Sequence, residues 1–365
     1  MKIILIGEHY SSNLGDAVIS TCFQSFLIEN NLKYELLDLS GRKGFQQSLS
    51  SVDASKLKKK IKENRFLKTA INIFHSYKLF SKYKINKCDE ETIAIYDGGS
   101  LFMDYFAPRQ YFLNRVLYRN SVCVNYLGCG MGKIDSLINK CLLYRAVNFK
   151  NVKTILLRDS VELFYRTFRK EAKPTEDIAL LSSVYFNRSI QNKSQKIIGI
   201  GFICLHKKFN EKFSDFILSL IEELEEKKIE WQIFTNGAPE DYYFAKCFYE
   251  SYTFKYGSLA KKPERTQDLI NNITSYDRLV TCRLHSAIIA YSYQIPAMAI
   301  IWSSKIEEFY RKIGHEELLI YSNFNHHNVT SKILSCSYTQ RDEEQLQGMQ
   351  RKIVSKLYSL LNMHE

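Results

Sequence analysis

The chain has 365 residues, of which 45% are apolar and 25% are charged, so it is long enough for two globular domains with separate cores. Its N-terminal apolar run is too short for a signal peptide and no stretch reaches membrane-spanning length, which predicts a cytoplasmic protein. The nine cysteines are odd in number and form no C-x-x-C pair. This argues against a disulfide framework or a zinc site, and it predicts reduced, mostly buried thiols.

The formal net charge of +12 is unevenly distributed, because residues 56–87 contain eleven Lys or Arg and the single acid Glu63. Aromatic residues alternate with these basic residues and predict a basic helical insertion over about 53–88. One interpretation is a solvated helix. The other is contact of residues 56–87 with an anionic membrane surface, on the inner face of the membrane. We expect no nucleic acid as a partner, because no nucleic-acid-binding motif accompanies the charge.

Short β-rich runs alternate with longer helical ones in the first half, a pattern typical of an α/β fold with parallel sheets. Most of these strands are apolar on both faces, as buried parallel strands are. The first strand leads through a polar loop into a helix predicted at 17–29. The predicted strands are Lys2–Ile6, Tyr34–Leu39, Thr92–Tyr96, Ser121–Tyr126 and Thr154–Leu157.

Three of these strands end in segments suited to ligands. Asp16 lies in the loop after the first strand, where it serves either as a base or as a helix N-cap. Gly98 and Gly99 follow the third strand and allow close approach of a ligand or a backbone. Gly128–Gly132 follows the fourth and predicts an anion-binding loop. Its spacing departs from G-x-G-x-x-G, and Arg158 replaces the acid expected after the next strand, so we do not expect a nicotinamide cofactor.

A polar stretch near residues 189–195 has no apolar period and is typical of a linker. We therefore predict an N-terminal Rossmann-like domain at 1–188, a C-terminal one at 196–338 and a closing helix at 339–365. The second domain has a helix at 213–228. Its predicted strands are Lys196–Ile203, Trp231–Thr235, Arg278–Thr281 and Ala297–Ile301.

The segment Thr281-Cys282-Arg283-Leu284-His285-Ser286 follows an apolar strand and precedes a small, apolar helix. Arg283 and His285 therefore lie at a strand-to-helix turn, where ligands of open α/β sheets bind. An Arg binds carboxylate or phosphate in a planar, bidentate way, and an imidazole exchanges protons near neutral pH. The alternative interpretation is a surface Arg and a hydrogen-bonded core His.

Taken in order, these segments resemble the polysaccharide pyruvyltransferase family over most of the chain, from Ile6 to Gly314. The matching residues are Asn13-Leu14-Gly15-Asp16, Asp97-Gly98-Gly99-Ser100-Leu101, Gly128–Gly132, Leu157-Arg158-Asp159-Ser160, Glu176-Asp177, Gly237 with Asp241, Arg283-Leu284-His285, Pro296, and Lys305 with Phe309 and Gly314. The resemblance implies two Rossmann-like domains facing across a cleft, similar to two-domain (GT-B-like) glycosyltransferases.

The resemblance also implies a transferase that moves the enolpyruvyl carbons of phosphoenolpyruvate onto two hydroxyls of a sugar, forming a ketal and releasing phosphate. The acceptor is then a surface polysaccharide, such as an exopolysaccharide or capsule, or its lipid-linked oligosaccharide precursor. Phosphoenolpyruvate is a co-substrate, so we expect no cofactor. We expect no metal either, because no cluster of His or carboxylates has ligand spacing.

Roles follow for individual residues. We expect His285, Arg283 and Asp16 to be catalytic, with His285 as general acid and Asp16 or Asp97 as the base. The expected donor-binding residues are Arg158, Arg283, Gly98, Gly99, Gly130 and Lys305, and the expected acceptor-binding residues are Asp97, Asn13 and Tyr10. Two alternatives stay open for Asp159, pairing with Arg158 or capping a helix, and for Lys305, binding phosphate or lying on a solvated face.

Two other functions fit the same sequence. The first is a GT-B-like glycosyltransferase that uses a nucleotide sugar, because a fold alone does not determine the reaction. The second is a non-catalytic member that binds glycan. The donor distinguishes the glycosyltransferase from the pyruvyltransferase, since only the latter needs phosphoenolpyruvate. Turnover distinguishes both enzymes from the non-catalytic member.

Overall fold

The structure is a computed structural model that describes residues 1–45, 65–85, 91–187, 196–321 and 329–363. The described chain divides into two compact units. The first unit comprises residues 1–10, 19–178 and 355–365, and the second comprises residues 11–18 and 179–354. The segment at 11–18, which contains the start of α1 (Leu14–Glu29), therefore packs with residues far from it in the sequence. The predicted linker at 189–195 lies outside the described residues.

The first unit contains a parallel sheet in the order β2-β1-β3-β5-β6-β7, with β4 paired to β5. Its strands are β1 (Lys2–Gly7), β2 (Lys33–Asp38), β3 (Thr92–Tyr96), β4 (Gly99–Phe102), β5 (Cys123–Met131), β6 (Val152–Leu157) and β7 (Lys173–Pro174). The residues at 3–6 of β1 are at most 1% exposed, as expected for a central strand of a parallel sheet covered on both faces.

The five strands predicted for the first half are present. The predicted end of the fourth was wrong, because β5 continues to Met131, so residues 128–131 are strand and not loop. The segment after β3 is also not a simple loop, since Gly99–Phe102 forms β4 against β5. Both errors have one cause: glycines suggest a turn in the sequence, whereas here they allow close packing of neighbouring strands.

The second unit contains a parallel sheet in the order β10-β9-β8-β11-β12-β13. Its strands are β8 (Ile197–Gly201), β9 (Glu230–Phe234), β10 (Gly257–Leu259), β11 (Arg278–Thr281), β12 (Ala297–Ile300) and β13 (Leu319–Ile320). The four predicted strands are confirmed. The short edge strands β10 and β13 were missed, because two or three residues show no periodicity.

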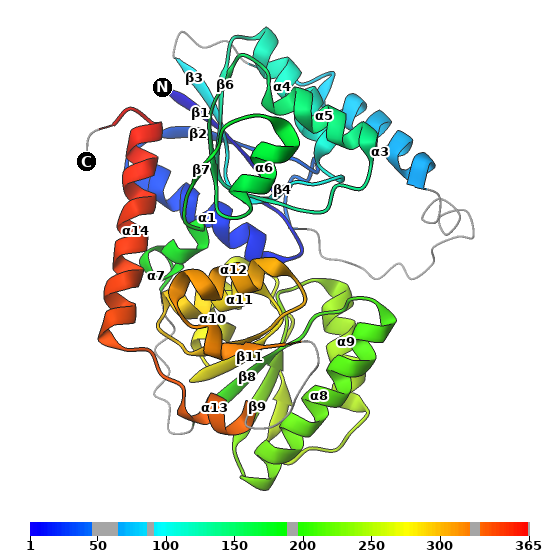
Figure 1. Ribbon diagram of the computed structural model, residues 1–365, viewed down its shortest axis with the longest axis vertical. Coiled ribbons are helices and arrows are strands. Elements are labelled where there is room, and N and C mark those ends of the chain that lie inside the picture. The colour runs from blue at the N-terminus through cyan, green and yellow to red at the C-terminus, as the bar shows by residue number, and fades with distance from the viewer. Residues whose placement is uncertain (46–64, 86–90, 188–195, 322–328, 364–365) are drawn as a thin grey trace. The chain divides into compact units, whose positions relative to one another are not determined.

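Helices cover the sheet of each unit (Figure 1). In the first unit α1 lies on one side of the sheet and α3, α4 and α5 on the other, and in the second unit α8 and α9 lie opposite α10 and α11. The helices are α1 (Leu14–Glu29), α3 (Arg65–Phe80), α4 (Ala107–Arg119), α5 (Leu137–Val147), α6 (Val161–Phe168), α7 (Ser182–Tyr185), α8 (Lys207–Glu226), α9 (Pro239–Glu250), α10 (Thr266–Thr274), α11 (Leu284–Ser292), α12 (Ser304–Ile313), α13 (Val329–Ser335) and α14 (Gln340–Leu360). The 3-10 turns are η1 (Ile178–Leu181) and η2 (Glu316–Leu318).

The predicted helix at 17–29 corresponds to α1, and the predicted closing helix at 339–365 corresponds to α14, which ends at Leu360. The helix predicted at 213–228 begins earlier, at Lys207. The end of α14 belongs to the first unit, where the Tyr358 hydroxyl donates to Asn30 Oδ1 at 3.2 Å. Within the basic insertion predicted over 53–88, the described part is mainly helix α3. Residues 46–64 and 86–90 lie outside the described residues.

Eight of the nine cysteines are described, and all eight are free thiols. Three are buried, three are partly buried and two are exposed, so the prediction of mostly buried thiols was too strong. In the part of the chain that the structure describes, no helix is long and apolar enough to cross a membrane.

Candidate functional site

The strand order places a crossover switch in each sheet. In the second unit the chain moves from β8 outward in both directions, to β9 on one side and to β11 on the other. Ligands of doubly wound sheets bind beyond the carboxyl ends of the two strands at such a switch. Thr281 ends β11 and pairs with Gly201 at the end of β8. Arg283 and His285 follow directly, so the sequence-based placement of this pair is confirmed.

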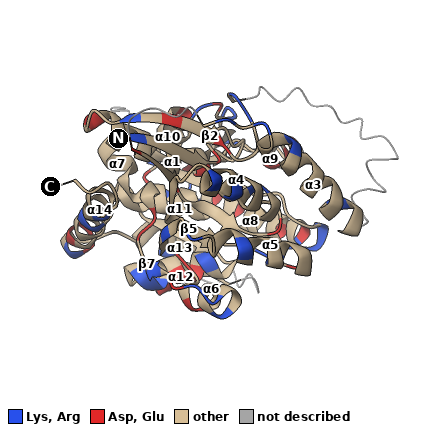
Figure 2. Cartoon of the chain, turned by 90° about the horizontal axis from the view of Figure 1, so that it is seen from above, with Lys and Arg blue, Asp and Glu red and all other residues tan. Residues whose placement is uncertain are grey.

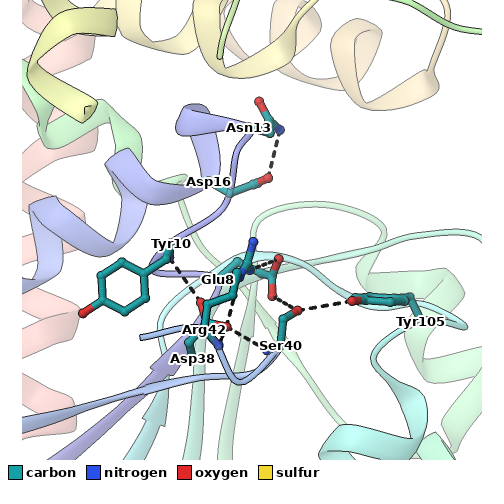
Figure 3. A network of polar contacts seen from close by, with 8 residues as sticks. All are labelled: Glu8, Tyr10, Asn13, Asp16, Asp38, Ser40, Arg42 and Tyr105. Carbon is teal, nitrogen blue, oxygen red and sulfur yellow. Dashed lines mark hydrogen bonds and ion pairs between the residues drawn. The ribbon is translucent and has the colours of Figure 1, made fainter. Parts of the chain in front are cut away.

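His285 lies in the first turn of α11 and is 7% exposed. Its Nδ1 is 3.6 Å from Asp16 Oδ1. Figure 3 shows the other contact of this carboxylate, in which Asp16 Oδ2 accepts a 2.9 Å hydrogen bond from Asn13 Nδ2. Gly15 makes the approach of His285 to Asp16 possible, because a Cβ at Gly15 would lie 2.5 Å from His285 Cβ. Asp16, expected in the loop before the helix, lies in the first turn of α1. The start of α1 and α11 therefore bring an acid-base pair together from residues about 270 positions apart.

Arg283 is held by a carboxylate to which the sequence assigned no role. Its guanidinium pairs with Asp241, which lies in the first turn of α9 and is fully buried. Burial raises the pKa of the Asp241 carboxyl, and the positive charge of Arg283 opposes that rise. The other oxygen of Asp241 accepts from the Cys204 backbone N–H at 2.8 Å. Asp241 thus fixes the direction of Arg283, although Gly237 and Asp241 had been noted only as matching the family pattern.

Asn236 connects this cluster to the segment at 11–18. Its backbone oxygen accepts from the Leu14 N–H at 2.8 Å, and its Oδ1 accepts from the Ser286 hydroxyl at 2.6 Å. The next residue, Gly237, has a φ of +98°, and a Cβ there would lie 2.8 Å from the Ser12 oxygen. Glycine is therefore required at this close approach of two loops.

Three buried polar atoms in this cluster have no hydrogen-bond partner among the described residues. They are Asn13 Oδ1, Asn236 Nδ2 and Arg283 Nε. Buried polar groups are normally hydrogen-bonded, because an unmade bond costs about 1–3 kcal/mol. One acceptor and two donors without partners beside an Arg–His pair are what a site for a polar, anionic ligand presents.

The first unit has its own switch, between β1 and β3. Asp97 follows β3 and is 2% exposed, with its Oδ2 at 3.4 Å from His9 Nδ1. Its Oδ1 packs directly against Gly7, since a Cβ added to Gly7 would lie only 1.9 Å from this oxygen. Burial raises the pKa of this carboxyl to about 6, against the lowering effect of His9 and Ser20. This position favours a structural role for Asp97, and its contact with an acceptor stays a prediction.

Arg158 lies in a buried ion cluster of the first unit. Its side chain is 4% exposed, Nη1 is 2.5 Å from Asp177 Oδ2, and Nε is 3.4 Å from Asp159 Oδ2. Asp159 also accepts from the Met131 N–H at 2.9 Å, and its carboxylate fills the space beside Gly130. Of the two alternatives for Asp159, the structure therefore shows the ion pair. Donor binding by Arg158 and Gly130 stays a prediction.

The other predicted contacts are more scattered. Gly98 and Gly99 have φ values of +107° and +79°, conformations that glycine favours. Tyr10 is partly exposed, and its N–H donates to Asp38 Oδ2 at 3.2 Å. Lys305 lies, partly exposed, in the first turn of α12. Their predicted contacts with donor or acceptor are not tested by these positions.

A second polar network in the first unit was missed from the sequence (Figure 3). Arg42 pairs with Glu8 Oε2 at 2.5 Å and with Asp38 Oδ1 at 3.2 Å, and the Ser40 hydroxyl donates to Glu8 Oε1 at 2.7 Å. Burial raises the pKa of the Glu8 carboxyl, although Arg42 opposes this. The amino-acid sequence contained little indication of this network, because its residues lie at the ends of two different strands and form no motif together.

Comparison with a protein-family model decides the family. The model for polysaccharide pyruvyl transferase matches residues 13–304. The chain belongs to the polysaccharide pyruvyl transferase family. The matched range contains Asn13, Asp16, Arg158, Arg283 and His285. A search of curated protein sequences finds no significant match.

Solved structures show the same fold at low identity. A putative UDP-N-acetylglucosamine 2-epimerase from Listeria monocytogenes has a TM-score of 0.58 at 8% identity, covering 100% of this chain and 97% of its own. MnaA of S. aureus with UDP has a TM-score of 0.56 at 12% identity, with the same coverages. The UDP-GlcNAc 2-epimerase of Methanocaldococcus jannaschii has 0.56 at 11% identity, covering 98% and 99%. These similarities establish an α/β fold with two Rossmann-like, GT-B-like units.

Proposed function

We propose that this pyruvyl transferase takes its pyruvyl group from phosphoenolpyruvate and forms a ketal on two hydroxyls of a sugar in a surface polysaccharide or its lipid-linked precursor. The observation that carries the proposal is the cluster in the second unit, where Arg283, His285 and Asp16 lie beside three buried polar atoms that have no hydrogen-bond partner within the described chain. The family match supports the transferase class. We place the reaction in the cytoplasm.

In the proposed reaction, His285 protonates the methylene carbon of the donor, and the central carbon becomes an electrophile. The first sugar hydroxyl attacks this carbon and loses its proton to Asp16 or to the imidazole. The second hydroxyl then attacks, the C–O bond to phosphate breaks, and phosphate leaves with a proton. Two C–O bonds to the sugar are formed, one C–O bond is broken, and the product carries a methyl group in place of the methylene.

Charge explains the roles of the remaining residues. The donor carries a carboxylate and a phosphate, and Arg283 offers a guanidinium whose direction Asp241 fixes. Its Nε and the Asn236 Nδ2 are the two donors of this cluster that find no acceptor among the residues the structure describes. Arg158, Gly98, Gly99, Gly130 and Lys305 are proposed as further donor contacts, and Asn13, Tyr10 and Asp97 as acceptor contacts.

No cofactor or metal enters this proposal. Across the described residues, no group of three or more His, Cys, Asp or Glu side chains is arranged to hold a metal ion. We expect activity to persist in a chelator, and its loss there would contradict the mechanism.

The first test is thermal unfolding with millimolar phosphoenolpyruvate. A ligand at about a hundred times its dissociation constant stabilises a protein by about 2.7 kcal/mol, which raises the midpoint by several degrees. We expect the shift in the wild type, its loss in Arg283→Ala, and its retention in Arg311→Ala. Arg311 is the matched control, because its side chain is 59% exposed on α12. No shift with phosphoenolpyruvate, but one with UDP, would favour a nucleotide-sugar glycosyltransferase.

The second test follows the methyl group. With phosphoenolpyruvate labelled with carbon-13 at the methylene carbon, saccharide acceptors and D₂O, we expect phosphate release together with a new, singly deuterated methyl signal. His285→Ala should abolish both while keeping the thermal shift with phosphoenolpyruvate. A protein that binds glycan but gives no turnover with any acceptor would support the non-catalytic alternative.

A further inference from the structure

Helix α3 has an apolar face that points into solvent. Five of its large apolar side chains are exposed: Phe66 (79%), Phe74 (69%), Tyr77 (53%), Leu67 (44%) and Ile71 (44%). Helices on a globular protein normally show the reverse, with apolar residues inward and polar residues outward. Single exposed apolar residues are common, but five on one short helix form a patch, and patches mark interaction surfaces.

These side chains share one side of the helix. At 3.6 residues per turn, positions 66, 67, 70, 71, 74 and 77 fall within an arc of about 140°. The opposite side of α3 packs against the rest of the first unit. On this side of the helix Ser76 is fully buried and Phe80 is 2% exposed. Asn72 on that side accepts from Arg109 Nη1 at 2.5 Å, and Asn72 Nδ2 donates to the Tyr105 oxygen at 3.0 Å. The inner side is thus attached to α4 by specific contacts, and the outer side is apolar.

The charges around this face have one sign. Residues 65–85 contain five Lys or Arg and no Asp or Glu. Lys68, Lys78, Lys82 and Lys84 are exposed, and Lys78 lies within the apolar arc. Figure 2 shows α3 free of acidic colour along its length. A second copy of this face would bring like charges together, whereas a surface that is apolar inside and negative outside complements both features.

We propose that the outer face of α3 lies on an anionic lipid bilayer, with Phe66, Leu67, Ile71, Phe74 and Tyr77 in the headgroup–acyl boundary and the lysines against the phosphates. At 16 residues the helix is about 24 Å long and lies along the interface, which is the geometry of interfacial amphipathic helices. This inference concerns a surface of the first unit and does not depend on the donor or acceptor proposed above.

The experiment is flotation of the full chain with vesicles of phosphatidylcholine, with and without phosphatidylglycerol. We expect binding to the anionic vesicles that weakens as salt rises, because the charge contribution is screened. Phe66→Ser with Phe74→Ser should weaken binding by at least about tenfold. Lys68→Gln with Lys78→Gln should weaken it by about fivefold for each lysine at low salt.

Matched control variants distinguish binding by this face from non-specific binding by exposed side chains elsewhere on the protein. Leu137→Ser removes an 83% exposed apolar side chain from α5, and Lys207→Gln with Lys208→Gln removes two exposed charges from α8. Neither should change vesicle binding. Wild type that fails to bind anionic vesicles, or variants of α3 that bind like wild type, would overturn the proposal. So would a dimer in solution that Phe66→Ser with Phe74→Ser dissociates, because the face would then be covered by a second copy.

Thermal unfolding of each variant completes the design. The substituted side chains are exposed, so the unfolding midpoints should match that of the wild type within a degree or two. Thermal stabilisation by phosphoenolpyruvate should be unchanged in the α3 variants. Loss of vesicle binding with retained ligand binding therefore tests this surface separately from the proposed reaction.

Discussion

The buried carboxyl of Asp97 gives a prediction whose size follows from the structure. Asp97 is 2% exposed, and burial raises its pKa from 3.8 to about 6. A carboxyl with a raised pKa in the folded protein binds its proton more tightly there than in the unfolded chain. The contribution of the protonated carboxyl to the free energy of unfolding is fully present below pH 3.8 and is lost as the pH rises through about 6. The rise in pKa corresponds to about 3 kcal/mol.

The perturbation is Asp97→Asn, which keeps the shape and removes the titration. Between about pH 4 and pH 6.5, the free energy of unfolding of the wild type should fall relative to that of the variant by about 2 kcal/mol, most of the full difference. Urea denaturation followed by circular dichroism at a series of pH values gives this difference. Asp135→Asn is the matched control, because Asp135 is an exposed carboxylate. Parallel curves for wild type and Asp97→Asn would refute the reasoning.

Two further predictions concern the cluster in the second unit. Gly15→Ala places a Cβ 2.5 Å from His285 Cβ, so it should displace the imidazole and lower the rate of phosphate release at least about tenfold. The control is Gly348→Ala on α14, where a Cβ meets nothing within 4 Å. This change should instead stabilise the protein by about 1 kcal/mol, because alanine favours a helix over glycine. Asp241→Asn leaves Arg283 without its buried partner and should cost about 3 kcal/mol of unfolding free energy together with most of the stabilisation by phosphoenolpyruvate. An Asp241→Asn protein that unfolds like wild type and keeps that stabilisation would contradict the positioning role.

The fold class and most of the strands could be predicted from the pattern of apolar residues. Buried parallel strands are nearly continuous apolar runs, so residues 3–6, 93–96 and 279–281 could be identified without a structure. The sequence also located the turn at Arg283 and His285, because this turn is local: an apolar strand, two functional residues and a helix follow one another in the chain. Helix boundaries were less certain, and glycines within β4 and β5 were mistaken for loops.

Which residues come into contact could not be predicted in this way. Asp241 beside Arg283, Asp16 beside His285, and Asn236 beside Leu14 are pairs far apart in the sequence, and folding of the chain against α9 and α11 brings them together. The structure also decided which charged residues are committed to internal ion pairs, as Arg158 is to Asp177. Residue type and periodicity report local geometry, whereas burial and pairing depend on what the rest of the chain packs against each side chain. The outer face of α3 is a further example. Its apolar residues could be identified in the sequence, but only the packing of the helix shows which of them face solvent.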